Sequence, residues 1–283
     1  MTWQILTFPE VDKIKQAREQ LHQAVQNVGS VGRSLLPHAD DDHQANLRWD
    51  RSVQRLVGRW IEMDDGKKFR SSLSFSDFAV YLVDQDYTTI SSIELEGKKQ
   101  STIMVWLEEQ FDLLGQDSAK LNLQLPYEIP AYPTSKGQPF NLEDPESAEV
   151  LGKYFHNTDV VVNEVIDSIE GASDVRCWPH HFDIASLITL NDSGDPETSK
   201  SIGVGMSPGD ENYDEPYFYV TPWPYPDDQK LTELTGTKGF WHTDGWIGAI
   251  LTATNLSQSN IQEQHEQVIR FYRRSIENLS EIL

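Results

Sequence analysis

The stretch that decides the fold runs from residue 54 to residue 95 and reads QRLVGRWIEMDDGKKFRSSLSFSDFAVYLVDQDYTTISSIEL. Apolar and polar residues alternate in it in short runs, the pattern of half-buried β-strands. Asp65-Gly66 is a dipeptide favoured in tight hairpin turns. The strand-like runs are 54–62, 68–75, 78–83 and 88–95. We therefore predict an antiparallel meander over residues 46–95.

Helical patterns flank this meander on both sides. The spacing of apolar residues predicts a helix over 10–28, which Gly29 and Gly32 would end, and a short strand over 31–36. An amphipathic helix is predicted over 99–114. Two further helices are predicted over 145–169, where Pro145 suits the first turn, and over 258–283.

The second half of the chain repeats this order of elements. Its predicted strands are 174–178, 182–190, 201–206, 216–221 and a run near 246–254. Prolines at 222, 224 and 226 argue against a central strand beyond Val220. The fold class is therefore α+β, mainly antiparallel sheet flanked by helices, with two similar halves as its finer form. We expect one compact unit over 1–283, with sub-halves 1–115 and 145–283 joined by a proline-rich crossing segment, 116–144.

The net charge of the chain argues against two classes of binding partner. The 45 acidic and 23 basic residues give a net charge of −22, which repels nucleic-acid backbones and anionic membranes. The N-terminus lacks the pattern of a signal peptide, and no run approaches ~18 apolar residues. We expect a soluble, cytoplasmic protein with a small molecule as the partner and with neither nucleic acid nor membrane; the oligomeric state is left open. A single cysteine excludes an internal disulfide.

The first candidate for a functional site is the segment RCWPHHFD at 176–183, which lies directly before an apolar run. If this segment is extended, His181 and Asp183 share one face and His180 points away from them. A His-x-Asp pair provides two metal ligands, or a base and the acid that orients it. The alternative is that these side chains only satisfy backbone groups beside a proline. Cys177 is predicted to be buried and inert rather than a nucleophile.

Two other segments carry the same residue types. The sequence places His242 and Asp244 at the same spacing, so the same two uses apply to them. Residues 38–43 read HADDDH, in which carboxylates suit hard cations and imidazoles suit transition metals. The spacing is not that of an EF-hand, and a solvated acidic loop is the default interpretation. The candidate metal ligands are His38, Asp42, His43, His181, Asp183 and His242.

An aromatic strand offers a different kind of site. Residues 217–226 read YFYVTPWPYP, and alternation puts Tyr217 and Tyr219 on one face. Such a row stacks flat ligands or sugars, or else packs a sheet edge. The candidate ligand-binding residues are Trp178, His180, Tyr217, Tyr219, Trp223 and Trp241.

Several of these motifs resemble one known family. The run Trp178–Ala185, the later Ser207–Asp210 and the aromatic Tyr217–Pro226 are similar to motifs of a group of bacterial proteins catalogued as a domain of unknown function. The segment from Pro37 to Trp49 resembles their N-terminal histidine-and-tryptophan region. Where relatives have small residues, this chain has His180 and His181, so ligand roles do not transfer to these two. The resemblance implies one full-length unit and no particular activity.

Three alternative functions are consistent with these residues. The first is a small-molecule enzyme, in its sharpest form a hydrolase assisted by a divalent metal, with His181, Asp183, His242 and Asp244 as ligands or acid/base groups. A metal-free variant uses a histidine as general base. The second is a non-catalytic binding protein whose aromatic pocket takes a flat or sugar-like ligand. The third is a structural or interaction protein.

Overall fold

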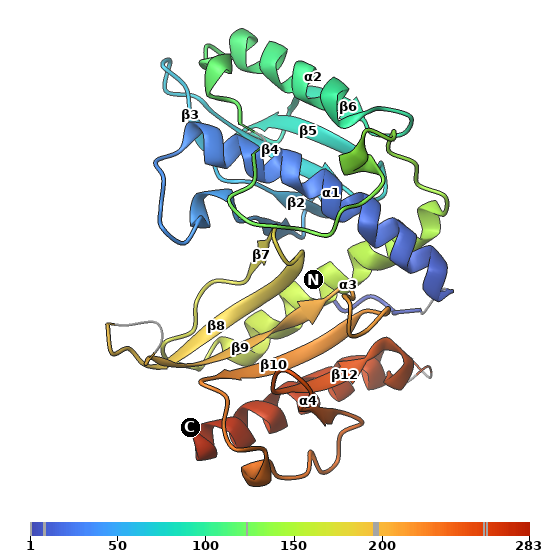
Figure 1. Ribbon diagram of the computed structural model, residues 1–283, viewed down its shortest axis with the longest axis vertical. Coiled ribbons are helices and arrows are strands. Elements are labelled where there is room, and N and C mark those ends of the chain that lie inside the picture. The colour runs from blue at the N-terminus through green and yellow to red at the C-terminus, as the bar shows by residue number, and fades with distance from the viewer. Residues whose placement is uncertain (1, 8–9, 123, 195–197, 257, 259) are drawn as a thin grey trace. The chain divides into compact units, whose positions relative to one another are not determined.

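The computed structural model describes residues 2–7, 10–122, 124–194, 198–256, 258 and 260–283. The chain forms two units, each with one antiparallel sheet, and each is described here by itself (Figure 1). The N-terminal unit comprises Asp12–Gly152 and Cys177–Phe182, and the C-terminal unit comprises Met1–Val11, Lys153–Arg176 and Asp183–Leu283. The boundary falls inside a helix, and the predicted crossing segment 116–144 belongs entirely to the N-terminal unit.

The elements confirm the predicted α+β class. The helices are α1 (Val11–Leu35), α2 (Gln100–Leu113), α3 (Pro145–Ile166) and α4 (Ile261–Ile282). The strands of the first half are β1 (Arg48–Asp50), β2 (Arg55–Val57), β3 (Ile61–Glu62), β4 (Lys68–Ser74), β5 (Ala79–Asp84) and β6 (Thr89–Glu94). Those of the second half are β7 (Arg176–Trp178), β8 (Asp183–Asn191), β9 (Lys200–Ser207), β10 (Tyr217–Trp223), β11 (Phe240–His242) and β12 (Gly248–Thr252).

In the N-terminal unit the predicted meander is confirmed. Its strands follow in the order β1-β2-β4-β5-β6, with β3 also pairing with β4, and all pairs are antiparallel. Gly66, at φ 81°, takes the left-handed turn that its Asp-Gly signal predicts. Helices α1 and α2 pack on one face of this sheet, where Val31, Phe69 and Phe111 share a buried cluster.

Helix α1 is longer than predicted. It continues through Gly29 and Gly32 to Leu35, so the strand predicted over 31–36 is wrong. The two glycines serve packing instead: a Cβ at Gly32 would lie 2.2 Å from the carbonyl oxygen of Gln44. At Gly29 it would lie 3.1 Å from the carbonyl oxygen of Ala45. Their missing side chains let the loop after α1 fold back onto the helix.

The other face of the first sheet carries stacked arginines. Arg70 is buried, lies 4.2 Å from the ring centre of Trp60 and 4.8 Å from that of Tyr87, and pairs with Asp50 at 3.0 Å. Arg55 lies 3.6 Å from the ring centre of Tyr81. The strand register puts Arg55, Arg70 and Tyr81 on one side of the sheet. We call this surface the arginine face and define it by these three residues.

In the C-terminal unit, five antiparallel strands follow in the order β11-β12-β10-β9-β8. One face packs against helices: the ring centre of Phe218 on β10 lies 6.0 Å from that of Tyr272 on α4 and 6.1 Å from that of Tyr154 on α3. The Tyr272 hydroxyl donates to the carbonyl oxygen of Gly205 at 2.8 Å, which ties α4 to β9. The amphipathic pattern of 258–283 thus reports a real buried stripe.

Strand β10 extends two residues beyond its predicted end at 221, but it is not a central strand beyond Val220, as its prolines predict. Pro222 pairs with Ile202 of β9, and the strand ends at Trp223. Pairing with β12 on the opposite edge already ends at Val220. Beyond Val220 the strand therefore has a neighbour on one side only, and a proline is tolerated at such a position.

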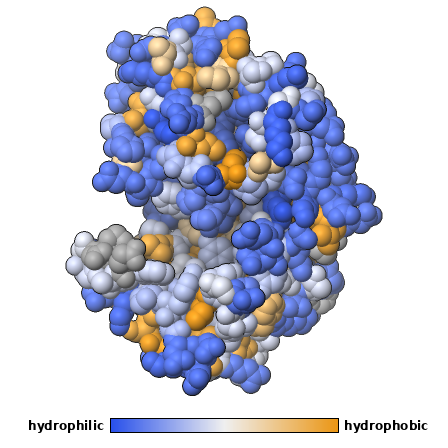
Figure 2. Space-filling model, viewed as in Figure 1, coloured by the Kyte–Doolittle hydropathy of each residue, from blue (hydrophilic) through white to orange (hydrophobic). Residues whose placement is uncertain are grey.

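The surface shown in Figure 2 is mostly hydrophilic, with scattered hydrophobic residues. No helix in the described part of the chain is long and apolar enough to cross a membrane. Cys177 is fully buried, as predicted.

Candidate functional sites

The two histidines of the RCWPHHFD segment lie in a turn, not on a strand. The turn is closed by a bond from the backbone N–H of Phe182 to the carbonyl oxygen of Trp178 at 2.8 Å. Phe182 has a φ of 57°, which a non-glycine residue adopts only at a cost. Because β8 begins at Asp183, the expectation that His181 and Asp183 share a strand face is wrong. His181 belongs to the N-terminal unit and Asp183 to the C-terminal unit.

Helix α1 holds this turn in place. The carbonyl oxygen of Pro179 accepts hydrogen bonds from Nε2 of His22 at 3.0 Å and from Nε2 of Gln26 at 2.7 Å. Nδ1 of His22 then accepts from the hydroxyl of Tyr132 at 2.8 Å, and the His22 ring stacks on Phe182 at 5.4 Å. Burial lowers the pKa of His22 to about 4, so its ring is neutral at pH 7 and serves as a structural link.

His180 is the half-buried histidine of the turn. Its ring centre lies 4.2 Å from that of His181, 5.3 Å from that of Tyr127 and 6.0 Å from that of Trp178. Burial, and then the neighbouring His181, lower the pKa of His180 to about 4, while Asp42 opposes the change. Within the described residues neither imidazole nitrogen of His180 forms a hydrogen bond with the protein. A neutral ring with both nitrogens available is suited to proton transfer or ligation.

The HADDDH loop meets the turn through Asp42. That residue has a φ of 54° and pairs with Arg33 of α1, whose Nη2 lies 2.8 Å from Oδ2. The same Nη2 donates to the hydroxyl of Tyr127 at 3.0 Å. His43 pairs at 2.7 Å with Asp41, and both are exposed. His38 is exposed too. The default interpretation of a solvated loop thus fits its tip, whereas Asp42 anchors the loop to the helix.

His242 and Asp244 lie in the C-terminal unit at the end of β11. Nδ1 of His242 accepts from the hydroxyl of Tyr213 at 2.8 Å, and Nε2 donates to the backbone carbonyl of Asp244 at 2.8 Å. The carbonyl can only accept, which fixes the tautomer. The imidazole stacks on Trp246 at 4.3 Å. Since both nitrogens are engaged and the Asp244 carboxylate is not the partner, neither metal ligation nor base catalysis by His242 is supported.

The C-terminal unit contains a cluster of hydrogen-bonded tyrosines and aspartates centred on β10. The hydroxyl of Tyr219 donates to Asp183 on β8, and the hydroxyl of Tyr217 donates to Asp210 at 2.5 Å. Asp210 also accepts from the backbone N–H of Tyr213 at 3.0 Å. Burial, followed by the adjacent carboxylates, raises the pKa of both β10 tyrosines, so they remain hydrogen-bond donors.

The rings of this cluster form a continuous row. The ring centres of Tyr219 and Tyr217 are 6.2 Å apart, and those of Tyr217 and Tyr213 are 5.0 Å apart. The row continues from Tyr213 to His242 at 5.7 Å and then to Trp246. Apart from Tyr217, which is buried, all of these rings are half-exposed.

Two glycines of β9 make room for this arrangement. The register pairs Gly205 with Tyr219 on one side and with Ala185 of β8 on the other. A Cβ at Gly205 would lie 2.5 Å from Cβ of Ala185, and a Cβ at Gly203 would lie 3.9 Å from the ring of Tyr219. Without side chains here, Tyr219 crosses β9 to reach Asp183. We call this surface the tyrosine face and define it by Asp183, Gly203, Gly205, Asp210, Tyr213, Tyr217, Tyr219, His242 and Trp246.

The predicted aromatic ligand residues are only partly brought together. Tyr217 and Tyr219 lie side by side, as alternation predicts. Trp223 and Tyr225 pair at the exposed end of β10, with ring centres 5.6 Å apart. Trp241 donates to the carbonyl oxygen of Thr232 at 2.7 Å, and Trp178 belongs to the N-terminal unit. Sequence reasoning missed Tyr213 and Trp246, which no motif marks, and Asp210, which lies in the quoted Ser-Pro-Gly-Asp run.

The predicted metal centre receives no support. Among the described residues, no group of three or more His, Cys, Asp or Glu side chains is arranged to hold a metal ion. A divalent metal therefore stays a prediction.

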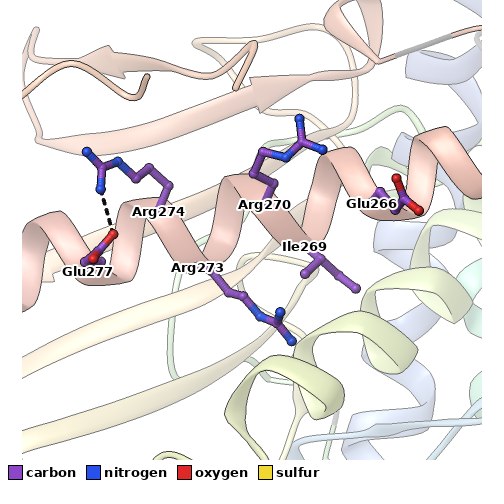
Figure 3. Close-up of a pocket in the computed structure, with 6 residues that line it drawn as sticks. All are labelled: Glu266, Ile269, Arg270, Arg273, Arg274 and Glu277. Atoms are coloured by element: carbon purple, nitrogen blue, oxygen red, sulfur yellow. Dashed lines mark hydrogen bonds and ion pairs between the residues drawn. The ribbon is translucent and has the colours of Figure 1, made fainter. Parts of the chain in front are cut away.

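A shallow depression of about 500 Å³ lies along α4 (Figure 3). All of its lining residues come from that helix: Glu266, Ile269, Arg270, Arg273, Arg274 and Glu277. Arg274 pairs with Glu277 at 2.7 Å, as the dashed line marks. None of the predicted site residues borders it, so we do not place the function there.

No protein-family model, no curated protein and no solved structure matches this chain. The resemblance to the bacterial domain family stays a prediction, and the function is argued from geometry.

Proposed function

We propose that the protein binds a small organic molecule on the tyrosine face of its C-terminal unit. The observation that carries this proposal is the row of rings from Tyr219 to Trp246, whose hydroxyls are held by Asp183, Asp210 and His242. Rings provide flat apolar contact, and the oriented polar atoms around them provide specificity. This is the binding function that the aromatic strand predicts, with fewer of the predicted tryptophans.

Two features favour binding over catalysis at this face. The histidine present, His242, has both ring nitrogens engaged, so proton transfer would first break a hydrogen bond. The tyrosines keep their protons because burial and adjacent carboxylates raise their pKa. A set of donors and acceptors whose histidine is already hydrogen-bonded on both nitrogens suits recognition better than reaction.

The test is a ligand-observed NMR screen of a panel of soluble amines, sugars and aromatic acids. Tyr219→Ala removes the centre of the row, and Tyr81→Ala removes a tyrosine from the first sheet as a matched control. We expect binders whose signals are lost with Tyr219→Ala and kept with Tyr81→Ala. If no compound binds, or if both variants lose the same binders equally, the proposal fails.

The second candidate function is the small-molecule enzyme, in its sharpest form a metal-assisted hydrolase. The observation that favours it is His180, a neutral imidazole with both nitrogens available beside His181 and Arg33-bound Asp42. The test is elemental analysis of untagged protein, compared with the His180→Ala, His181→Ala double variant. Near-stoichiometric metal that this variant loses would favour the enzyme. An equal metal content in both proteins would exclude a metal centre at this turn.

A further inference from the structure

The first sheet shows how this chain satisfies an Asp–Tyr pair on a sheet face that the helices leave uncovered. Asp77 accepts from the hydroxyl of Tyr81 at 2.9 Å, and Arg55 lies over that ring at 3.6 Å while reaching the carboxylate at 3.4 Å. Asp50 accepts from the hydroxyl of Tyr87, and Arg70 lies over that ring while pairing with the carboxylate. In both pairs a guanidinium stacks on the ring and neutralises the acid.

The tyrosine face contains the same kind of pair in the second sheet. The hydroxyl of Tyr217 donates to Asp210, whose other partners are the backbone N–H groups of Asn212 and Tyr213, at 2.7 and 3.0 Å. Across the described part of the chain, no arginine or lysine lies over the rings of Tyr213, Tyr217 or Tyr219, and none pairs with Asp210. The cation that completes each pair of the first sheet has no counterpart here.

We infer that the tyrosine face binds a small planar organic cation, an amidinium or a guanidinium, stacked on the partly exposed rings of Tyr213 and Tyr219 and paired with Asp210. The inference deepens the proposed function and rests on it. A cation over an aromatic ring is attracted by the negative ring face, and a carboxylate beside the ring adds charge-assisted hydrogen bonds. The net charge of −22 also raises the local concentration of cations around the protein.

The probes are three isosteric compounds: benzamidinium, benzamide and benzoate, which differ in charge and hardly at all in shape. Dissociation constants are measured by NMR titration on the full chain, up to about 10 mM, where fragments of this size bind. Asp210→Asn keeps the shape of the pair and removes its charge, and Tyr217→Phe tests the same pair if the first variant folds poorly. Asp77→Asn on the first sheet is the matched control, and near-UV circular dichroism checks each fold.

We expect benzamidinium to bind about tenfold more tightly than benzamide, and Asp210→Asn to abolish that preference while Asp77→Asn keeps it. Benzamidinium binding that resists Asp210→Asn and falls only with salt would reflect net charge and would overturn the inference. Benzamide or benzoate that binds as tightly as benzamidinium, with binding lost in Tyr219→Ala, would overturn the inferred preference for a cation. The proposed function would still stand in that case. No binding by any of the three overturns the inference, and the broader panel decides the proposed function.

Discussion

The two sheets partner the tyrosines and aspartates on their helix-free faces in different ways. Each has helices on one face and leaves the other to tyrosines and aspartates. In the first sheet, arginines from within the sheet lie on the tyrosines and pair with the acids. In the second, the Asp210 pair consists of a phenol and a carboxylate alone. The first face therefore pairs its acids with cations from the chain itself, whereas no arginine or lysine among the described residues pairs with Asp210.

The burial of the charges shows what the difference means for stability. The side chains of Arg70 and Asp50 are 4% and 7% exposed, so removing either one leaves the other as an uncompensated buried charge. Asp210 and Tyr219 are half-exposed and keep contact with water. We therefore expect substitutions of the buried Arg70–Asp50 pair to cost more stability than substitutions on the tyrosine face.

The largest expected effect is that of Arg70→Ala. This substitution leaves the buried Asp50 without its buried cation and removes the guanidinium that packs on Trp60 and Tyr87, so we expect a loss of about 3–5 kcal/mol in the free energy of unfolding. Urea denaturation followed by fluorescence measures it. The matched control is Arg48→Ala: Arg48 also reaches Asp50, at 3.3 Å, but is half-exposed. Equal losses in the two variants would show that burial does not set the value of these pairs.

The next largest effect is expected at Gly205 of the tyrosine face. In Gly205→Ala the new methyl group would lie 2.5 Å from Cβ of Ala185 and 2.6 Å from the carbonyl oxygen of Ile184, so β8 and β9 must separate. We expect about 3 kcal/mol of destabilisation, measured by urea denaturation.

Gly137→Ala is the control for glycine replacement in general. Gly137 has a φ of 88° and no atom within 4 Å of its would-be Cβ, so it reports backbone strain without crowding. We expect a cost of about 1 kcal/mol there. A smaller loss at Gly205 than at Gly137 would mean that β9 relaxes easily and that this glycine does not shape the face.

Part of this comparison could be predicted from the sequence and part could not. Alternation predicts that Tyr217 and Tyr219 share a face, and Asp65-Gly66 predicts the first hairpin. The partner of Tyr219, Asp183, lies two strands away, a pairing that only the register of β8, β9 and β10 decides.

The failed expectations have physical causes of their own. Gly29 and Gly32 resemble helix ends, yet they lie inside α1 because tertiary packing needs their missing side chains. His181 and Asp183 have the spacing of a pair on one strand face, yet Phe182 between them has a left-handed backbone conformation. No residue pattern predicts a non-glycine residue in that conformation.

A smaller effect is expected from Tyr219→Phe, which removes the hydroxyl that donates to Asp183 and keeps the ring. A hydrogen bond to a charged acceptor contributes about 1.5 kcal/mol, and half-exposure lets water replace part of it. The control is Tyr225→Phe, at a tyrosine that is 46% exposed, where we expect a change within about 0.5 kcal/mol. Both are read by urea denaturation, and a cost at Tyr219 no larger than that at Tyr225 would contradict a held hydroxyl.

The smallest effect concerns the pH dependence of the stability that Asp50, the partner of Arg70, provides. Burial alone would raise the pKa of Asp50, but hydrogen bonds from Ser52 and Tyr87 and the charge of Arg70 outweigh it and hold the pKa at about 2. Because this folded-state pKa lies below the usual 3.8, the stabilisation is present above pH 3.8 and is lost as the pH falls toward 2. Tyr87→Phe removes one of these bonds and raises the pKa of Asp50.

Between about pH 5 and pH 2.5, Tyr87→Phe is therefore expected to lose about 1 kcal/mol less stability than the unsubstituted protein. Unfolding free energies from urea titrations across this range measure the difference. Tyr81→Phe is the comparison, since its partner Asp77 is 47% exposed and solvent screens the change. If both variants reduce the loss of unfolding free energy at low pH by the same amount, the buried pair has no special electrostatic role. The buried and the exposed Asp–Tyr pair of the first sheet would then contribute equally to stability, and burial would not set the value of either.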